Sequence, residues 1–255
     1  MAGPGKRGVV APEDIRLIVT GGARGIGAAT ARLMAEAGAQ VMIADVLDDE
    51  GATLAEKLGK RAIYRHLDVT READWREAVA AASTRFGGVN ALFNNAGILD
   101  FGGVTECAPD AFRNVLEVNL VGAFLGLHVT APEIAKAGGG TIVNTSSTAG
   151  LQGYGGLAAY VSSKWGVRGL TKAAALDLAD DGIRVVSLHP GPIRTPMTET
   201  LDDSVAAAQP IARFGEADEV ARMARFLFTE ATYSTGSEFV VDGGAVTGQV
   251  IPLPS

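Results

Sequence analysis

The stretch I-R-L-I-V-T-G-G-A-R-G-I-G at residues 15–27 decides the fold, because an apolar run leads directly into a glycine-rich turn. Ile15–Thr20 predicts a buried strand, and Ala28–Ala37, behind the turn, has the periodicity of a helix that Gly38 ends. A strand, a tight turn and a helix in this order are the opening unit of an α/β domain.

The same alternation continues along the chain. Further strands are expected at Val41–Asp45, Arg61–Leu67, Ala91–Asn94, Thr141–Asn144, Ile183–Leu188 and Glu238–Val241. Further helices are expected at Asp48–Leu58, Glu72–Phe86, Asp110–Ala135 (with a kink at Pro132), Ala158–Leu178 and Ala217–Phe228. Most strands are apolar throughout, which favours a parallel sheet covered on both faces. With no linker or repeat, we expect one domain over residues 15–255 behind a mobile extension, Met1–Asp14.

The composition excludes several classes of protein. The 255 residues include 33 glycines, 47% are hydrophobic, and the net charge is −7. Without a dense basic run, binding to nucleic acid or to an anionic membrane is not expected. No apolar stretch suggests a membrane span or a signal peptide, and Cys107 has no partner for an internal disulfide. We therefore expect a soluble, cytoplasmic protein.

The glycine turn indicates a phosphate site. Gly21, Gly25 and Gly27 are spaced G-x-x-x-G-x-G rather than in the common dinucleotide pattern G-x-G-x-x-G. Such glycines let the backbone approach a pyrophosphate, which then lies at the positive end of the following helix. An ordinary turn is the alternative, but the position between strand and helix favours the phosphate site.

Two charged residues bear on the choice between NAD and NADP. Asp45 ends the second predicted strand, where a carboxylate accepts hydrogen bonds from ribose hydroxyls and repels a 2′-phosphate. Arg24 lies inside the glycine turn and favours the 2′-phosphate instead. Because Asp45 would face the 2′ position directly, the sequence predicts NAD.

Chemistry-bearing side chains gather near the fifth strand and the helix that follows it. Tyr160 and Lys164 are four residues apart, so a helix places both on one face. A nearby ammonium lowers the pKa of a phenol, so such a pair can transfer a proton near neutral pH. Ser147 follows the fifth predicted strand, 13 residues before the tyrosine, and Ser146 is its rival.

Four motifs together, T-G-x-x-x-G-x-G, N-N-A-G, the serine and Y-x-x-x-K, resemble the short-chain dehydrogenase/reductase family from about Ile15 to Gly244. The resemblance implies a single-domain Rossmann-type doubly wound parallel sheet of about seven strands, and a homotetramer or homodimer. Tyr160 would be the acid/base, Ser147 would orient the substrate oxygen, and Lys164 would bind the nicotinamide ribose. Asn119 would help to hold a proton-relay water.

The resemblance also implies a cofactor site and a subgroup. The cofactor-binding residues would be Gly21, Arg24, Gly25, Ile26, Gly27, Asp45, Asp68, Val69, Asn95, Gly97, Tyr160, Lys164, Pro190, Gly191, Ile193 and Thr195. Stretches such as S-K-W-G-V-R-G-L-T-K and Y-S-T-G-S-E-F-V-V-D-G-G are similar to bacterial 3α(20β)-hydroxysteroid dehydrogenases, an NAD-linked subgroup.

Substrate contacts are expected from loops at the strand ends. The candidates are Ser147, Leu151, Gln152, Tyr154, Tyr160 and Met197. With few charges among these loops, a small apolar alcohol or ketone, such as a hydroxysteroid or another cyclic alcohol, fits better than a sugar phosphate. The histidines lack metal-ligand spacing, so no metal is expected. The alternatives are a 3-oxoacyl-carrier-protein reductase, which Asp45 disfavours, and a dinucleotide-binding regulator without catalysis.

Overall fold

The computed structural model describes residues 9–248 of the chain. Its helices and strands are β1 (Arg16–Thr20), α1 (Gly25–Glu36), β2 (Gln40–Asp45), α2 (Asp48–Leu58), β3 (Ala62–His66), α3 (Glu72–Phe86), β4 (Ala91–Asn94), α4 (Pro109–Leu116), α5 (Gly122–Lys136), β5 (Gly140–Thr145), α6 (Ala158–Asp177), β6 (Ile183–Pro190), β7 (Ile193–Arg194), α7 (Ser204–Ala207), β8 (Gly215–Glu216), α8 (Ala217–Thr229) and β9 (Glu238–Val241).

Seven strands form one parallel sheet in the order β3-β2-β1-β4-β5-β6-β9. The first strand, β1, lies inside the sheet, and β2 and β3 extend the sheet from it toward one edge. The chain then crosses to the other side of β1, where β4, β5, β6 and β9 extend the sheet toward the opposite edge. This reversal is the topology of a doubly wound fold, in which ligands bind beyond the carboxyl ends of the strands. The predicted fold class is confirmed.

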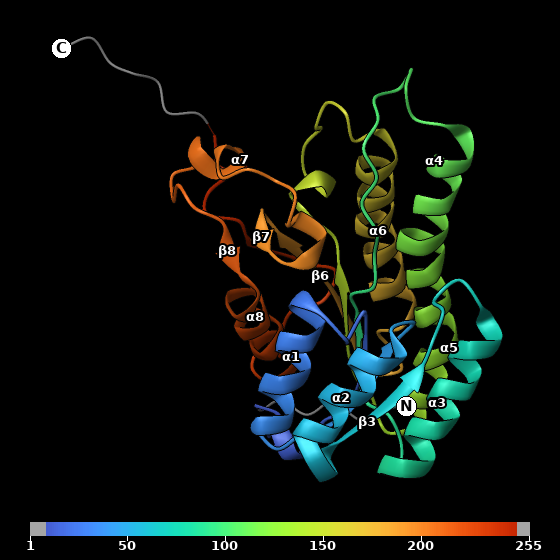
Figure 1. Ribbon diagram of the computed structural model, residues 1–255. Helices are drawn as coiled ribbons and strands as arrows, with labels where there is room; N and C mark the ends of the chain where they lie inside the picture. The colour runs from blue at the N-terminus through green and yellow to red at the C-terminus, as the bar shows by residue number, and fades with distance from the viewer. Residues whose placement is uncertain (1–8, 249–255) are drawn as a thin grey trace.

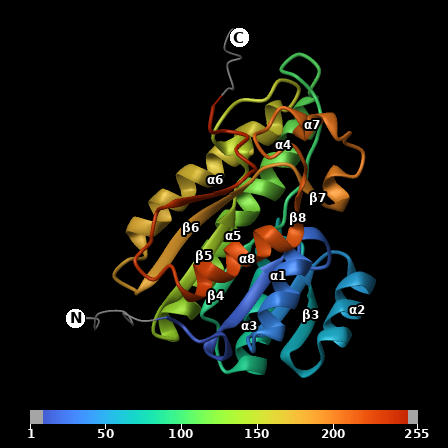
Figure 2. The same cartoon turned by 90° about the vertical axis from the view of Figure 1, so that its left-hand side faces the viewer.

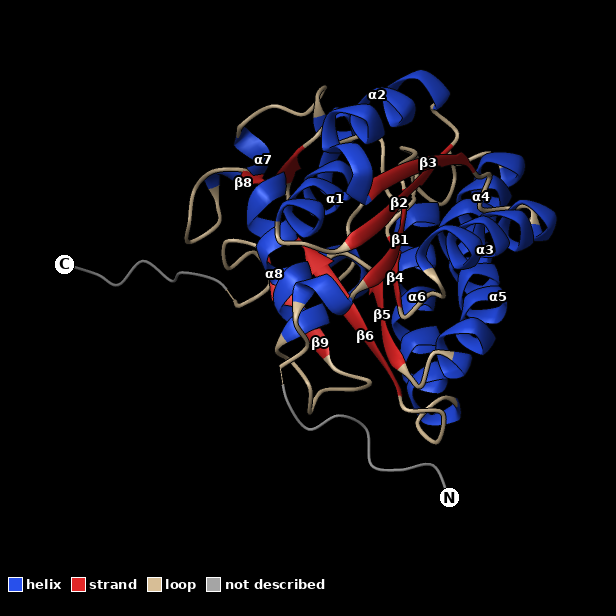
Figure 3. Ribbon diagram, turned by 90° about the horizontal axis from the view of Figure 1, so that it is seen from below, coloured by secondary structure: helices blue, strands red, loops and turns tan. Residues whose placement is uncertain are grey.

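Helices cover both faces of the sheet, with α1, α2 and α8 on one side and α3, α4, α5 and α6 on the other (Figure 3). Successive side chains of a strand point to opposite faces of the sheet, so each strand contributes to the hydrophobic core on both faces. On β1, Leu17 and Val19 pack in the core that contains Leu227 of α8, whereas Ile18 packs in the core that contains Trp75 of α3. All five of these side chains are buried.

The predicted helix over 110–135 consists of two α-helices joined by one π-helical turn at Glu117–Val121. The irregularity therefore lies at this turn, and α5 continues through Pro132 to Lys136. The whole stretch Pro109–Lys136 has the length and hydropathy of a membrane span, which corrects the expectation that no such stretch exists. Half of the most apolar part of this stretch is buried inside the protein. Its helices α4 and α5 pack against α6 and α3, as helices of a protein core do.

The small elements β7, α7 and β8 were not expected. They lie together in the upper half of Figure 1 and of Figure 2. Residues 1–8 of the predicted extension lie outside the described part. The mobility of the extension stays a prediction; within residues 10–14, Pro12–Asp14 form a 3-10 turn and the N–H of Val10 donates to the carbonyl of Thr229 at 2.8 Å.

Candidate active site

A cavity of about 430 Å³ opens at the carboxyl ends of the central strands. Most of the predicted site residues line it, namely Gly21, Arg24, Ile26, Asn95, Gly97, Ser147, Gln152, Tyr154, Tyr160, Lys164, Pro190, Gly191, Ile193, Thr195 and Met197. The remaining ones, Gly25, Gly27, Asp45, Asp68, Val69, Asn119 and Leu151, do not form part of its wall. The fold thus brings the glycine turn and the Tyr–Lys pair to one cavity, and leaves Leu151 out of the predicted substrate wall.

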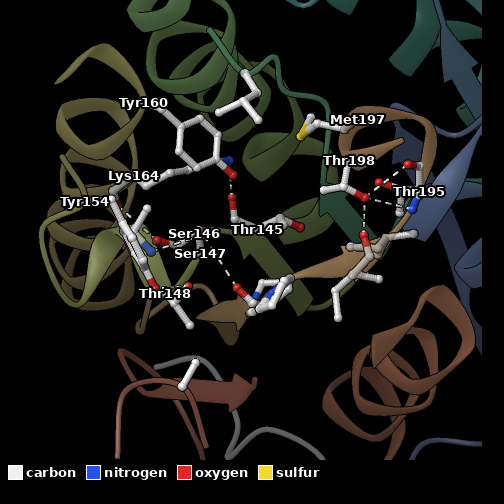
Figure 4. A pocket seen from close by; sticks show the side chains of 18 of the residues that line it. Thr145, Ser146, Ser147, Thr148, Tyr154, Tyr160, Lys164, Thr195, Met197 and Thr198 are labelled. Carbon is white, nitrogen blue, oxygen red and sulfur yellow. Dashed lines mark hydrogen bonds between the residues drawn. The ribbon is translucent and has the colours of Figure 1, made fainter. Parts of the chain in front are cut away.

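Tyr160 and Lys164 lie in the first two turns of α6 and face the cavity together (Figure 4). The Lys164 ammonium lies 5.5 Å from the centroid of the Tyr160 ring, and it donates a hydrogen bond to the carbonyl of Thr145 at 3.0 Å. The Lys164 side chain is buried. The end of β5 therefore fixes the lysine beneath the phenol.

Ser147 and Ser146 have different roles in the local structure. The Ser146 hydroxyl is buried and donates to the carbonyl of Lys164 at 3.0 Å. The Ser147 hydroxyl donates to the carbonyl of Pro190 at 3.5 Å and accepts from the N–H of Ala149 at 3.1 Å, and it lies close enough to the Tyr160 phenol to lower its pKa. Ser147, and not Ser146, therefore has its hydroxyl beside the phenol in the cavity.

Burial controls the ionisation of the pair. Desolvation raises the pKa of Tyr160 above its ordinary value, although the Ser147 hydroxyl favours the phenolate. Desolvation also lowers the pKa of Lys164 to about 8. The expectation that the nearby ammonium lowers the phenol pKa is not met in the protein alone, because desolvation by burial is the largest cause of the shift and raises the pKa of Tyr160. A neutral phenol at this position is a proton donor at neutral pH.

His189, whose contact with Ser147 could not be predicted from the sequence, supports the backbone at that serine. It is fully buried, and its Nδ1 lies 3.0 Å from the carbonyl of Ser147. A carbonyl only accepts, so Nδ1 carries the proton, and Nε2 then accepts from the hydroxyl of Ser187 at 2.8 Å. Burial lowers the pKa of His189, in agreement with this neutral ring.

Asn119 lies in the π-helical turn and its side chain is used by the protein itself. Its amide donates to the carbonyl of Ile98 and to the hydroxyl of Ser163, each at 3.0 Å, and its oxygen accepts from the N–H of Ile98 at 2.8 Å. These bonds join the loop after β4 to α6, one residue before Lys164. Asn119 also borders a second, much smaller cavity with Val69.

The glycine turn forms a cradle that only glycine can build. Gly21 and Gly25 have φ angles of +59° and +53°, a region that side chains rarely adopt. A Cβ on Gly27 would lie 2.0 Å from the carbonyl oxygen of Gly21, and one on Gly25 would press on Thr195 at 3.2 Å. The backbone of the turn and the N-terminus of α1 are thus left open to a phosphate group.

Asp45 ends β2 beside this cradle and is 9% exposed. Its carboxylate accepts from the N–H groups of Ala23 at 3.0 Å and of Leu47 at 3.1 Å, which fixes it against the glycine turn. Arg24 pairs with Glu50 of α2 instead of pointing freely from the turn. The sequence did not indicate this pairing, because Glu50 lies 26 residues away.

At the end of β3, Asp68 closes a turn by accepting from the N–H and hydroxyl of Thr70, at 2.9 and 2.8 Å. Val69 beside it is buried. Both lie at the same sheet edge as the cavity but outside its wall. Among residues 9–248, no three His, Cys, Asp or Glu side chains cluster as metal ligands would.

Comparisons with known proteins agree with this geometry. The model of a family described as enoyl-(acyl carrier protein) reductase matches residues 21–246. The 3-alpha-(or 20-beta)-hydroxysteroid dehydrogenase of Mycobacterium tuberculosis is 45% identical over 91% of this chain and 89% of its own. The trans-4-hydroxycyclohexanecarboxylate dehydrogenase of Sinomonas cyclohexanicum is 43% identical, over 91% and 92%. The cyclohexanol dehydrogenase of an Acinetobacter species is 40% identical, over 89% and 92%.

Proposed function

The chain belongs to the short-chain dehydrogenase/reductase family, and on that premise we propose that it is an NAD-dependent dehydrogenase of apolar cyclic alcohols such as hydroxysteroids. It is an oxidoreductase that interconverts a secondary alcohol and a ketone with a nicotinamide dinucleotide. The observation that carries the proposal is that Tyr160, Lys164 and Ser147 line one mostly apolar cavity together with the glycine turn.

The cradle at the glycine turn fits a dinucleotide, because a Cβ on Gly27 would clash with the carbonyl of Gly21, so only glycine lets the turn pack this tightly against the N-terminus of α1, where a pyrophosphate would bind. When bound, the cofactor supplies or accepts the hydride. We assign the turn and the N-terminus of α1 to the pyrophosphate. The loops after β4 and β6 would hold the nicotinamide end with residues Asn95, Gly97, Pro190, Gly191, Ile193 and Thr195. Asp68 and Val69 would border the adenine.

The preference for NAD rests on two contacts. The Asp45 carboxylate is fixed beside the turn by two backbone N–H groups, so it would accept from the ribose hydroxyls and repel a 2′-phosphate. Glu50 pairs with Arg24, which weakens the attraction of that guanidinium for a 2′-phosphate.

The proton chemistry belongs to three side chains. In the reducing direction Tyr160 donates its proton to the ketone oxygen, which the Ser147 hydroxyl orients by a hydrogen bond. In the oxidising direction the phenolate accepts the alcohol proton, and the Lys164 ammonium stabilises that phenolate. Asn119 positions the loop at Ile98 and would help to hold a relay water between Lys164 and solvent.

Exposed aromatic rings on α5 and α6 support a homodimer or homotetramer. Phe124 and Trp165 are 49% and 44% exposed, and both helices lie on the same face of the sheet (Figure 3). Large exposed apolar side chains of this kind often mark an interface. Sedimentation velocity tests this proposal: a dimer or tetramer supports it and a monomer contradicts it. We also propose a cytoplasmic location.

A cofactor-coupled screen tests the function. The wild-type protein is assayed at 340 nm with cyclohexanol, a hydroxysteroid and a 3-oxoacyl thioester, each with both nicotinamide dinucleotides. We expect oxidation of the cyclic alcohols with NAD. Reduction of the thioester alone, with NADPH, would favour a 3-oxoacyl-carrier-protein reductase, and no turnover of any compound would favour a regulator without catalysis.

A further inference from the structure

The wall of the cavity on the side of Ser147 contains a chain of neutral polar groups that the proton transfer does not use. The Gln152 amide donates to the hydroxyl of Tyr154 at 2.8 Å, and that hydroxyl donates to the hydroxyl oxygen of Thr148 at 3.1 Å. All three residues line the cavity. Figure 4 shows Tyr154 and Thr148 on the same side as Ser147, across the view from Met197.

This chain has free hydrogen-bonding capacity. A glutamine amide offers two N–H donors and an oxygen that accepts. Among residues 9–248, one N–H of Gln152 is used by Tyr154, and the amide oxygen and the second N–H have no protein partner. The hydrogen bond to Thr148 fixes the direction of the Tyr154 hydroxyl, so the open groups are those of the amide.

A substrate that displaces water from the Gln152 amide would leave its oxygen and second N–H without hydrogen bonds in an apolar surrounding. The cavity is otherwise lined by many apolar side chains, among them Leu99, Leu157, Met197, Leu201 and Val205. A polar group that loses its water without gaining a partner destabilises the complex. A purely hydrocarbon ring would therefore leave the Gln152 amide unpaired, whereas a substrate oxygen beside it would restore the hydrogen bond.

The charges around the cavity also indicate that a substrate oxygen beside Gln152 should be neutral. The charged residues that line it, within the described part of the chain, are Arg24 and Lys164. Arg24 is paired with Glu50 at the glycine turn, and Lys164 lies beneath Tyr160. A carboxylate at Gln152 would have no cation beside it, and burying an unpaired charge is expensive.

We propose that Gln152 and Tyr154, supported by Thr148, form a subsite for a second, neutral oxygen of the substrate, a hydroxyl or a carbonyl remote from the reacting carbon. The inference rests on the proposed function and narrows it to cyclic alcohols with two uncharged oxygen groups. A hydroxyl uses both the oxygen and the free N–H of the amide, and a ketone oxygen uses the N–H alone.

The test compares matched substrates that differ in one oxygen. The first pair is cyclohexanol and trans-1,4-cyclohexanediol, with the diol corrected for its two equivalent hydroxyls. The second is a 3-hydroxysteroid with and without a keto group at the opposite end. In at least one pair the wild type should favour the dioxygenated member by about tenfold in kcat/KM, as one recovered hydrogen bond implies. Trans-4-hydroxycyclohexanecarboxylate should be a poorer substrate than the diol.

Substitutions test whether Gln152 and Tyr154 cause the preference for the substrate with two oxygens. Gln152→Leu combined with Tyr154→Phe should bring the ratio within each pair close to one, and Tyr233→Phe, which removes a phenol hydroxyl from a fully exposed side chain, should keep the wild-type ratio. Equal kcat/KM within both pairs in the wild type, a preference for the carboxylate, or a preference that survives the double substitution would overturn the subsite alone. Failure to oxidise any alcohol would overturn the proposed function and the subsite with it.

Discussion

The Lys164 ammonium lies one helical turn from Tyr160, 5.5 Å from the centroid of its ring, and is held there by the carbonyl of Thr145. Because the side chain is buried, the pKa of Lys164 falls to about 8. Burial at this position thus destabilises the charged form of Lys164, and its effect on the free energy of unfolding depends on pH.

Between pH 8 and 10.5 the unfolded chain holds a proton on Lys164 that the folded protein has released. Folding stability therefore rises with pH in this window, and the free energy of unfolding of the wild type should gain up to about 3 kcal/mol relative to Lys164→Met. Urea denaturation of both proteins from pH 7 to 11 measures the difference. The same substitution at the exposed Lys60 is the control, and a difference that stays constant with pH would contradict the lowered pKa.

Glu238, on the edge strand β9, accepts from Arg168 at 2.6 Å and from Lys172 at 2.8 Å. These cations lower the pKa of Glu238 to about 2. The stabilisation is complete above the ordinary glutamate pKa of about 4.5 and is lost as the pH falls through 2. Glu238→Gln should cost up to about 3 kcal/mol at pH 7, and the cost should vanish near pH 2.

Chemical denaturation of Glu238→Gln at several pH values checks that cost. Glu77→Gln, which breaks an exposed pair with Arg65, is the matched control and should cost less than about 1 kcal/mol. Equal effects of the two substitutions at pH 7 would show that the link between β9 and α6 contributes no more than a surface ion pair.

Cofactor choice should depend on Asp45 and on the partner of Arg24. Asp45→Ala removes the repulsion of a 2′-phosphate, so the ratio of kcat/KM for NAD over NADP should fall by about tenfold or more. Glu50→Gln should lower the ratio as well, because it frees the guanidinium. Asp49→Ala, on the exposed surface of α2, should leave it unchanged. A ratio unaffected by Asp45→Ala would remove that residue from its proposed role.

The sequence predicted the parts of the site that depend on local spacing. The glycine turn and the Tyr160–Lys164 pair could be recognised because each lies within a few residues of its partners. The π-helical turn at Asn119 was missed, since apolar periodicity looks the same through it. The two-residue strands β7 and β8 are too short to have a periodicity.

Contacts between distant segments could not be derived in this way. The pairing of Arg24 with Glu50 and the support of Ser147 by His189 depend on how loops fold over the strand ends. The raised pKa of Tyr160 likewise reflects burial, which spacing alone does not reveal. Burial reversed the expected direction of that pKa shift.

The acid/base role of Tyr160 is tested most directly by the turnover of Tyr160→Phe with NAD and a cyclic alcohol that the wild type oxidises, together with NADH binding measured by fluorescence titration. The phenyl ring keeps the packing on α6 and removes only the proton donor and acceptor. We expect a loss of at least about a hundredfold in kcat with NADH still bound, and near-normal activity for Tyr233→Phe. Near-normal kcat in Tyr160→Phe would contradict this role.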